Sequence, residues 1–218
     1  MSELTLIIGN KNYSSWSLRP WIALKQADIP FTERMILLFD ENWDAEISKV
    51  SPTKKVPVLI DGDITICETL AILEYAHELY PEKELWPTDQ RARAVARSVS
   101  SEMHAGFGAL RNHMSMNIRK DHTGRGMGPG VAEDISRVSK IWNDCRKNYG
   151  QNGDFLFGKF GNADAMFAPV VSRFKTFGVE LDAVSQAYCD VVLNTQAYLE
   201  WQSDALKETW IIESDEID

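Results

Sequence analysis

The chain has 218 residues, of which 44% are hydrophobic and 25% are charged, a composition typical of soluble globular proteins. Its formal net charge of −9 argues against nucleic-acid binding, because an acidic surface repels phosphate groups. No apolar run approaches the roughly 20 residues that span a bilayer, and no signal-peptide pattern opens the sequence. We therefore expect a cytoplasmic protein that binds neither nucleic acid nor membrane.

The cysteines and histidines do not predict a metal site. Cys67, Cys145 and Cys189 are widely spaced and odd in number, and no C-x-x-C pair occurs. We therefore expect free thiols in a reducing compartment and no bound metal. The histidines likewise lack the spacing of metal ligands.

The first 80 residues alternate between strand and helix patterns. The apolar run at residues 4–8 predicts a buried strand, and helical periodicity follows it to about residue 29. Further strands are predicted at 31–38, at 57–61 and at 63–67, with a short helix before the second of these. Asp61-Gly62 predicts a hairpin turn, and the helix after residue 68 ends at Pro81. The predicted order is β-α-β-α-β-β-α.

Strand patterns almost disappear after Asp89. A long helix is predicted over 91–114, a glycine-rich break follows, and further helices are predicted to about residue 206. The change near 81–88 predicts an α/β domain at 1–82 and an all-helical domain at 89–218. The acidic end, ESDEID, is expected to fray.

The segment NYSSWSLRPW, residues 12–21, joins the first strand to the first helix. Ser14, Ser15 and Ser17 can each cap a helix, and if Ser17 or Trp16 is the cap, Pro20 falls in the first turn, where its missing N–H costs little. Alternatively, Ser14 and Ser15 lie at the positive end of the helix dipole and stabilise a bound thiolate. The segment alone leaves both interpretations open.

Two further junctions allow a structural and a binding interpretation. Val56-Pro57 opens a strand, and a cis bond there would present the backbone groups of Val56 to a peptide ligand. Glu68-Thr69 opens the third helix, where Thr69 can cap the helix or bind a carboxylate and Glu68 can bind an ammonium group.

In this order and spacing, the three junctions resemble the glutathione S-transferase superfamily. SSWSLRPWIAL is most similar to the zeta-class motif S-S-C-S-x-R-x-x-I-A-L, with Trp16 where that class has cysteine. The segment NADAMFAP resembles the N-capping motif S/T-x-x-D of the family, with Asp164 as the acid and Gly161 in place of the hydroxyl residue. The resemblance covers the whole chain. It implies a thioredoxin-like α/β domain with a mixed four-stranded sheet, followed by an all-α domain.

The resemblance also implies where glutathione binds. The γ-glutamyl end would lie on Glu68 and Thr69, and the cysteine backbone would pair with Val56 beside cis-Pro57. Lys55 could pair with the glycine carboxylate. The implied thiol-facing residue is Ser14, five residues before Arg19, with Ser15 as the alternative.

The implied activity is a glutathione transferase that directs a thiolate at a small electrophile. The expected electrophile pocket consists of Trp16, Met103, His104, Phe107 and Arg111. Arg19 is expected to be structural. The resemblance also implies a homodimer.

Two other functions stay open. One is a zeta-like cis-trans isomerase that uses glutathione as a coenzyme and recognises a dicarboxylate, for which Arg111, Arg119 and Arg173 are available. The other is a non-catalytic glutathione-binding module.

Overall fold

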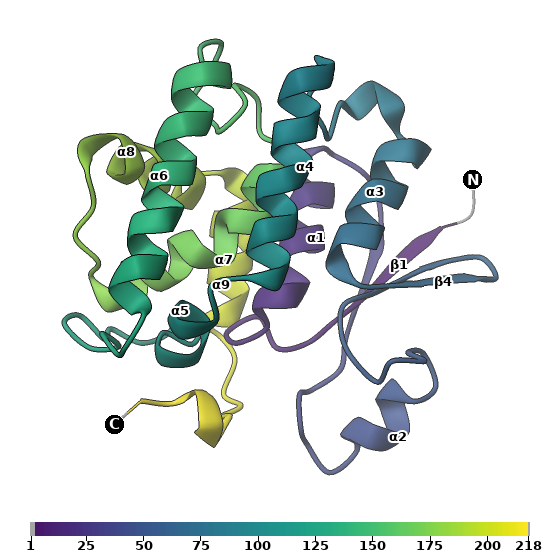
Figure 1. Ribbon diagram of the computed structural model, residues 1–218. Helices are drawn as coiled ribbons and strands as arrows, with labels where there is room; N and C mark the ends of the chain where they lie inside the picture. The colour runs from purple at the N-terminus through teal and green to yellow at the C-terminus, as the bar shows by residue number, and fades with distance from the viewer. Residues whose placement is uncertain (1–2, 218) are drawn as a thin grey trace.

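The computed structural model describes residues 3–217, and its N-terminal part is built on a four-stranded mixed sheet of order β2-β1-β3-β4 (Figure 1). The strands are β1 (Leu4–Ile8), β2 (Thr32–Met35), β3 (Val58–Asp61) and β4 (Ile64–Cys67). β1 pairs with β2 in parallel, while the β1–β3 and β3–β4 pairs are antiparallel. The predicted mixed sheet and its hairpin are confirmed.

Helices cover both faces of this sheet because the side chains of β1 alternate between two apolar clusters. Leu6 and Ile8 face the main core, on the side of α1 (Ser15–Gln26) and α3 (Thr69–Leu79). Ile7 instead packs in a smaller cluster with Ile47 of α2 (Trp43–Ile47), which lies apart from the other two helices in Figure 1. The predicted β-α-β-α-β-β-α order is confirmed.

The second strand is shorter than predicted and lies at the edge of the sheet. Residues 31–38 were expected to form it, but only Thr32–Met35 do, and all four are exposed. Pairing with β1 ends where the Ile36 N–H donates to Ile8, and the Leu38 N–H donates to the side chain of Asn10 at 2.8 Å. The chain leaves the sheet there because a side-chain acceptor replaces the neighbouring strand.

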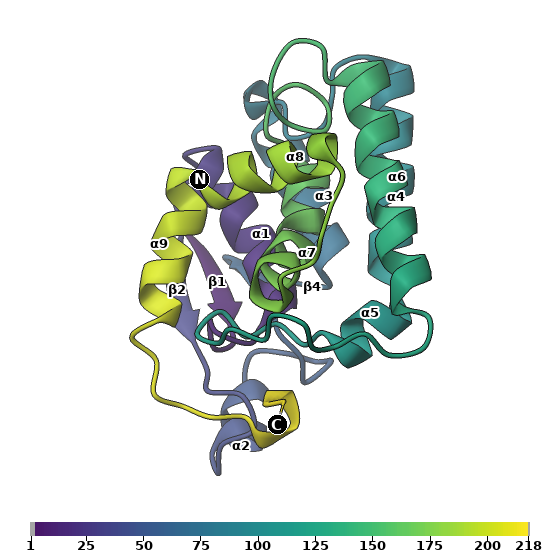
Figure 2. The ribbon, with the colours of Figure 1, turned by 90° about the vertical axis from the view of Figure 1, so that its left-hand side faces the viewer.

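The remaining chain is helical. After the short 3-10 turn η1 (Pro81–Lys83), the helices are α4 (Gln90–Ala105), α5 (Gly108–His113), α6 (Val131–Tyr149), α7 (Asn162–Phe177), α8 (Ala183–Leu193) and α9 (Gln196–Ala205), with a final turn η2 (Glu213–Asp215). Figure 2 shows α7 between α1 and the layer formed by α4 and α6. None of the helices within residues 3–217 is long and apolar enough to cross a membrane.

The single long helix predicted over 91–114 is wrong. Gly106 has an extended backbone and ends α4, and Phe107 takes a left-handed conformation with φ 58°. These two residues redirect the chain into α5, because neither conformation can continue an α-helix. The apolar spacing runs through both helices, which is why the sequence pattern hid the break.

The main hydrophobic core runs from the sheet through α1 into the helical part. It includes Leu6 and Leu59 of the sheet as well as Trp142 of α6 and Trp201 of α9. Trp201 contacts Trp21 of α1 edge to face, with ring centroids 5.1 Å apart. The two parts therefore share one apolar interior, and the division into 1–82 and 89–218 stays a prediction.

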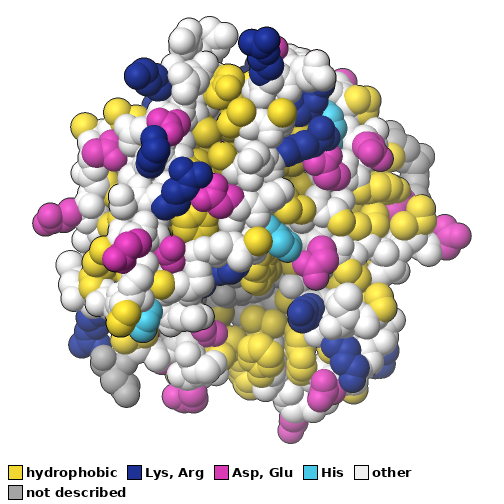
Figure 3. Space-filling view, viewed as in Figure 1, with side chains coloured by type: hydrophobic (Ala, Val, Ile, Leu, Met, Phe, Trp, Pro, Cys, Tyr) yellow, Lys and Arg dark blue, Asp and Glu magenta, His cyan; other side chains and the backbone are white. Residues whose placement is uncertain are grey.

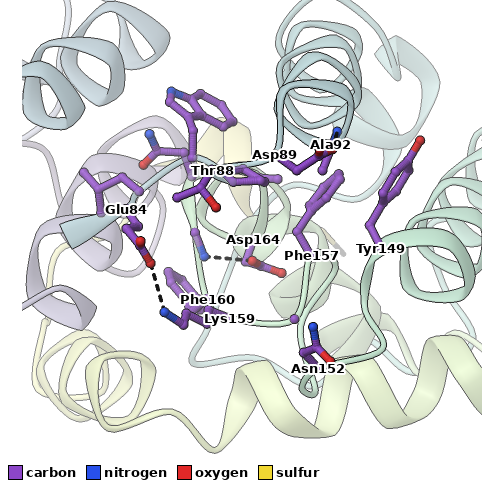
Figure 4. Close-up of a pocket in the computed structure, with 17 residues that line it drawn as sticks. Glu84, Thr88, Asp89, Ala92, Tyr149, Asn152, Phe157, Lys159, Phe160 and Asp164 are labelled. Atoms are coloured by element: carbon purple, nitrogen blue, oxygen red, sulfur yellow. Dashed lines mark hydrogen bonds and ion pairs between the residues drawn. The ribbon is translucent and has the colours of Figure 1, made fainter. Parts of the chain in front are cut away.

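The start of α7 is held by a buried acid. The Gly161 N–H donates to Asp164 Oδ2 at 2.9 Å, while the Leu156 N–H and the Tyr188 hydroxyl both donate to Oδ1 at 3.1 Å. Asp164 is 1% exposed. Figure 4 shows it beside a cavity of about 290 Å³ lined by the 84–89 segment, α4 and the 152–161 loop. Half of a capping box is thus present, as predicted, because Gly161 has no side chain to complete it.

The acidic end of the chain is docked, so the expectation of fraying is wrong for residues 213–217. Glu216 accepts hydrogen bonds from the Tyr13 hydroxyl at 2.6 Å and from Asn117 at 3.0 Å, and it pairs with Lys120 at 3.2 Å. The Ser115 hydroxyl donates to the Asp215 carbonyl at 3.1 Å. These partners lie about a hundred or more positions away in sequence, which is why no local pattern predicted them.

Candidate functional site

The first helix begins at Ser15, and its N-cap residue, Ser14, makes no side-chain capping bond. The Ser14 hydroxyl turns away from the helix N–H groups and donates to the Ser17 hydroxyl oxygen at 2.7 Å. Ser14 and Ser15 are each 7% exposed, and Ser17 is fully buried. The prediction that these serines cap the helix through their hydroxyls is therefore wrong for Ser14, whose oxygen stays at the positive end of α1.

Because the N-cap is Ser14 and not Ser17 or Trp16, Pro20 lies inside α1 and not in its first turn. A proline at this position has no N–H for the carbonyl four residues earlier, which belongs to Trp16. The Thr69 hydroxyl donates to that carbonyl instead, at 3.2 Å. Pro20 thus leaves an acceptor through which the start of α1 is joined to the start of α3.

The Val56–Pro57 peptide bond is cis, as the binding interpretation requires. Val56 is partly exposed, and the preceding Lys55 is exposed. The Ser51 hydroxyl fixes this segment, because it donates to the Lys55 carbonyl at 2.8 Å and accepts from the Lys55 N–H at 3.1 Å. The backbone of Val56 is therefore held at the entrance to β3.

Glu68 and Thr69 differ in the parts they play at the start of α3. Glu68 occupies the N-cap position with φ 70°, a left-handed conformation that costs a non-glycine residue about 1–3 kcal/mol. Thr69 is the first helical residue, so it is not the cap, and its hydroxyl is used by Trp16. Its backbone N–H lies in the first turn, where a carboxylate is stabilised. The unusual conformation of Glu68 is typical of a functional position.

These segments surround one cavity of about 310 Å³. Seven predicted site residues line it together with Thr53: Trp16, Lys55, Val56, Pro57, Glu68, Thr69 and His104. Figure 3 shows that this face of the molecule is hollowed near its middle, where histidine, acidic and basic side chains surround the opening. Ser14 and Ser15 directly precede Trp16 at the start of α1.

The predicted electrophile residues separate into two groups. His104 and Arg111 lie around Trp16: the His104 ring is 5.1 Å from the Trp16 ring, and the Arg111 guanidinium lies 5.6 Å over it. Met103 and Phe107 instead belong to the hydrophobic core and are 0% and 6% exposed. The structure does not bring those two side chains to the cavity.

Arg19 and Arg111 lie over the Trp16 ring, and Arg173 is close enough for its charge to act on Arg19. The guanidinium of Arg19 stacks on the Trp16 ring at 4.2 Å and donates to the carbonyls of Ser15 and Met166, which joins α1 to α7. Burial, followed by the charges of Arg173 and Arg111, lowers the pKa of Arg19 well below its usual value. Arg19 thus has the structural contacts that were expected of it.

Arg173 is the other buried member of this cluster. It donates to the carbonyls of Arg111 and Met114, and burial, with the charge of Arg111, lowers its pKa to about 10. The carboxylate of Asp215 is the acidic group that acts on it. Arg119 lies elsewhere and holds Tyr13 and the C-terminal segment, so it is not part of the cluster.

Thr53 and Ser17 are the site residues that sequence reasoning missed or misread. The Thr53 hydroxyl lies 3.1 Å from that of Ser51 in the loop before Val56, and its place near the proline was the only available signal. Ser17 was read as a cap, whereas it accepts hydrogen bonds from Ser14 and from the Gly9 N–H, the latter at 3.0 Å. Its contact with Gly9 lies outside the helix pattern.

Among residues 3–217, no group of three or more histidine, cysteine, aspartate or glutamate side chains could hold a metal ion. The three cysteines are free, as predicted. Burial raises the pKa values of the Cys145 and Cys189 thiols to about 12, so neither is a ready nucleophile.

An α/β part with a cis-proline beside the start of α1, followed by helices, defines a thioredoxin-like fold with a helical extension. Residues 10–84 match the family model described as glutathione S-transferase, N-terminal domain. Maleylacetoacetate isomerase of Mus musculus is 37% identical over 170 residues, which is 77% of this chain and 76% of that protein. The probable maleylacetoacetate isomerase of Caenorhabditis elegans is 35% identical over 172 residues, 77% of each chain.

A solved glutathione transferase homolog from Burkholderia, with bound glutathione, has the same fold. Its TM-score is 0.72 at 21% identity, covering 94% of this chain and 98% of that one. The chain belongs to the glutathione S-transferase superfamily and is zeta-like, so the recognition made from the sequence is confirmed. The expected glutathione transferase activity and the two-part fold are confirmed with it.

Proposed function

We propose that the 310 Å³ cavity binds glutathione, with each charged group of the tripeptide beside a group of the site that complements its charge. The γ-glutamyl ammonium group would lie on Glu68 and its carboxylate on the N–H of Thr69. The cysteine backbone would pair with Val56, and Lys55 would meet the glycine carboxylate. The sulfur would then lie at Ser14, with Ser15 as the alternative, where a helix dipole and a hydroxyl favour the thiolate.

The glutathione assignment can be tested by calorimetry. Glu68→Gln keeps the shape of the side chain but removes the charge that faces the ammonium group. We expect glutathione to bind about 10-fold more weakly, because a charge-assisted hydrogen bond contributes about 1.5–3 kcal/mol and a neutral one less. Glu78→Gln, a change on the same helix outside the cavity, is the control and should bind normally. Equal affinities for both variants and the parent would contradict the assignment.

We further propose that the electrophile carries a carboxylate. The supporting observation is the cluster of Arg19, Arg111 and Arg173: burial and the charges of Arg173 and Arg111 lower the pKa of Arg19, and burial and the charge of Arg111 lower that of Arg173. An anion bound there relieves the repulsion between like charges. Arg111 is the member best suited to bind it, because it is partly exposed and lies over Trp16 next to His104.

A matched pair of electrophiles tests this specificity. An α,β-unsaturated carboxylic acid and its methyl ester present the same reacting carbon with and without the charge. We expect Arg111→Met to lower kcat/KM for the acid about 10- to 100-fold and to leave the ester within about twofold, since a charged hydrogen bond is worth about 1.5–3 kcal/mol. An equal loss of kcat/KM for the acid and the ester would show that Arg111 does not bind the carboxylate of the substrate.

The same arginine cluster favours glutathione-dependent cis-trans isomerisation as a second candidate function. The relatives from mouse and C. elegans are named maleylacetoacetate isomerases. In such a reaction the thiolate adds to the double bond, rotation follows, and the thiolate leaves again, so glutathione is not consumed. Incubation with maleylacetoacetate would separate the two: isomerisation gives the trans product with free thiol constant, whereas conjugation consumes thiol in proportion to product.

A further inference from the structure

Two hydroxyl groups at the start of α1 form a continuous hydrogen-bonded chain that ends on the sheet. The Ser14 hydroxyl donates to Ser17 Oγ at 2.7 Å, and the Gly9 N–H donates to the same oxygen at 3.0 Å. Ser17 is 0% exposed, and Gly9 directly follows β1. Ser17 therefore connects the residue nearest the proposed sulfur position to the end of a central strand.

The direction of the Ser14–Ser17 hydrogen bond limits what Ser14 can do. A serine hydroxyl has one proton, and Ser14 gives its proton to Ser17. In this arrangement Ser14 offers lone pairs, which can accept a hydrogen bond from a thiol S–H but cannot donate to a thiolate. To stabilise a thiolate, Ser14 must turn its proton toward the sulfur, and its oxygen then needs another donor.

Ser17 is placed to be that donor. Its hydroxyl has a proton of its own, and a small turn of the Ser17 side chain would direct this proton at Ser14 Oγ. The Gly9 N–H continues to donate to Ser17 in both arrangements, so the buried oxygen always keeps a partner. In the reversed arrangement each donor polarises the next, which strengthens the final hydrogen bond to the sulfur.

We propose that Ser17 is a positioning residue for thiol activation, which reverses the Ser14–Ser17 hydrogen bond when the bound thiol ionises. The thiol proton leaves to water, each serine keeps its single proton, and no covalent bond to the serines forms. This inference rests on the proposed role of Ser14. It adds that a Ser14 hydroxyl without Ser17 behind it stabilises the thiolate less well.

The pH titration of the enzyme–glutathione complex measures this directly, because the thiolate absorbs in the ultraviolet and the thiol does not. We expect Ser17→Ala to raise the pKa of the bound thiol by about 0.5 to 1, which leaves about 3- to 10-fold less thiolate below that pKa. Glutathione affinity at low pH, where the thiol is protonated throughout, should change less than about twofold, because Ser17 does not line the cavity.

Three further variants separate this effect from a loss of structure. Ser100→Ala alters another fully buried serine, in α4, and should leave the titration unchanged. Ser14→Ala should raise the thiol pKa, and adding Ser17→Ala to it should raise it no further. If Ser17→Ala does not fold, Ser17→Cys keeps a weak donor of similar size and should give a smaller rise in the same direction.

A parental titration curve for folded Ser17→Ala or Ser17→Cys, combined with a shifted curve for Ser14→Ala, would overturn the inference and leave the proposed function intact. Additive shifts in the double variant would also overturn it, because Ser17 would then act independently of Ser14. A parental curve for Ser14→Ala would instead remove the proposed role of Ser14, and the inference with it.

Discussion

The starts of α1 and α7 pack in the same core but use their polar side chains in opposite ways. At α7, the carboxylate of Asp164 accepts hydrogen bonds within the protein, from two backbone N–H groups and from the Tyr188 hydroxyl. At α1, Ser14 makes no capping bond; its hydroxyl donates to Ser17, and Trp16, two residues further on, lines the cavity. A helix start whose N–H groups are bound by a side chain of the protein stabilises the fold, whereas one whose N–H groups are left without such a partner is available to a ligand.

The largest expected effect is at α7. Asp164→Ala leaves two buried donors and one partly buried donor without an acceptor, so we expect a loss of about 3–5 kcal/mol in the free energy of unfolding. Asp182→Ala removes an exposed cap with a similar number of hydrogen bonds and should cost only about 1 kcal/mol. Urea denaturation measures both. An equal loss of unfolding free energy in the two variants would show that burial of Asp164 does not increase its contribution to stability.

The pH dependence of stability should also reveal Asp164. Burial raises its pKa from 3.8 to about 6, so the folded state binds the proton more tightly than the unfolded state does. Its contribution is therefore full below pH of about 4 and is lost as the pH rises through about 6, by up to about 3 kcal/mol. Asp164→Asn does not titrate. The free energy of unfolding of the parent minus that of Asp164→Asn should fall as the pH rises from about 4 through about 6. A rise would mean that the hydrogen bonds to Asp164 lower its pKa more than burial raises it.

At α1 the effect should appear in catalysis and not in stability. Ser14→Ala should lower kcat/KM for glutathione conjugation about 10- to 150-fold, since the proposed hydrogen bond from its hydroxyl to the thiolate would contribute about 1.5–3 kcal/mol while the helix dipole remains. The free energy of unfolding should change by less than about 1 kcal/mol, because no cap is lost. Ser15→Ala is the matched comparison. A greater loss of activity in Ser15→Ala would reverse the ranking of the two serines.

The smallest expected effect concerns the joint between α1 and α3. Thr69→Val removes the donor to the Trp16 carbonyl and should cost about 1 kcal/mol of stability. Pro20→Ala supplies a backbone N–H to the same carbonyl. Thr69→Val should therefore cost less in the Pro20→Ala background than in the parent. An identical cost in both backgrounds would show that the two donors do not substitute for each other.

The sequence predicted those features that depend on neighbouring residues. The cis bond at Pro57 was implied only by the family resemblance, whereas the strand at 4–8 and the tight turn after Asp61 follow from a local apolar run and from one residue type. The junction at Glu68 was recognisable for the same reason. Because the motif order matched a known family, the position of the cavity could also be anticipated.

Features that depend on distant contacts could not be predicted in this way. Arg173 joins Arg19 and Arg111 across more than 60 residues of sequence, and periodicity alone does not separate a core methionine such as Met103 from one in a pocket. The role of Ser17 was missed because its partner Gly9 lies just after the preceding strand, eight positions away in sequence. Packing decided each of these cases, and packing is a property of the whole fold.

The docking of residues 213–217 has a practical consequence for work with this enzyme. Glu216 accepts a hydrogen bond from the hydroxyl of Tyr13, which directly precedes Ser14, the residue proposed to face the thiol. A change that displaces this segment would therefore also release Tyr13 and Asn117 from Glu216. Kinetic comparisons between variants should keep residues 213–217 intact.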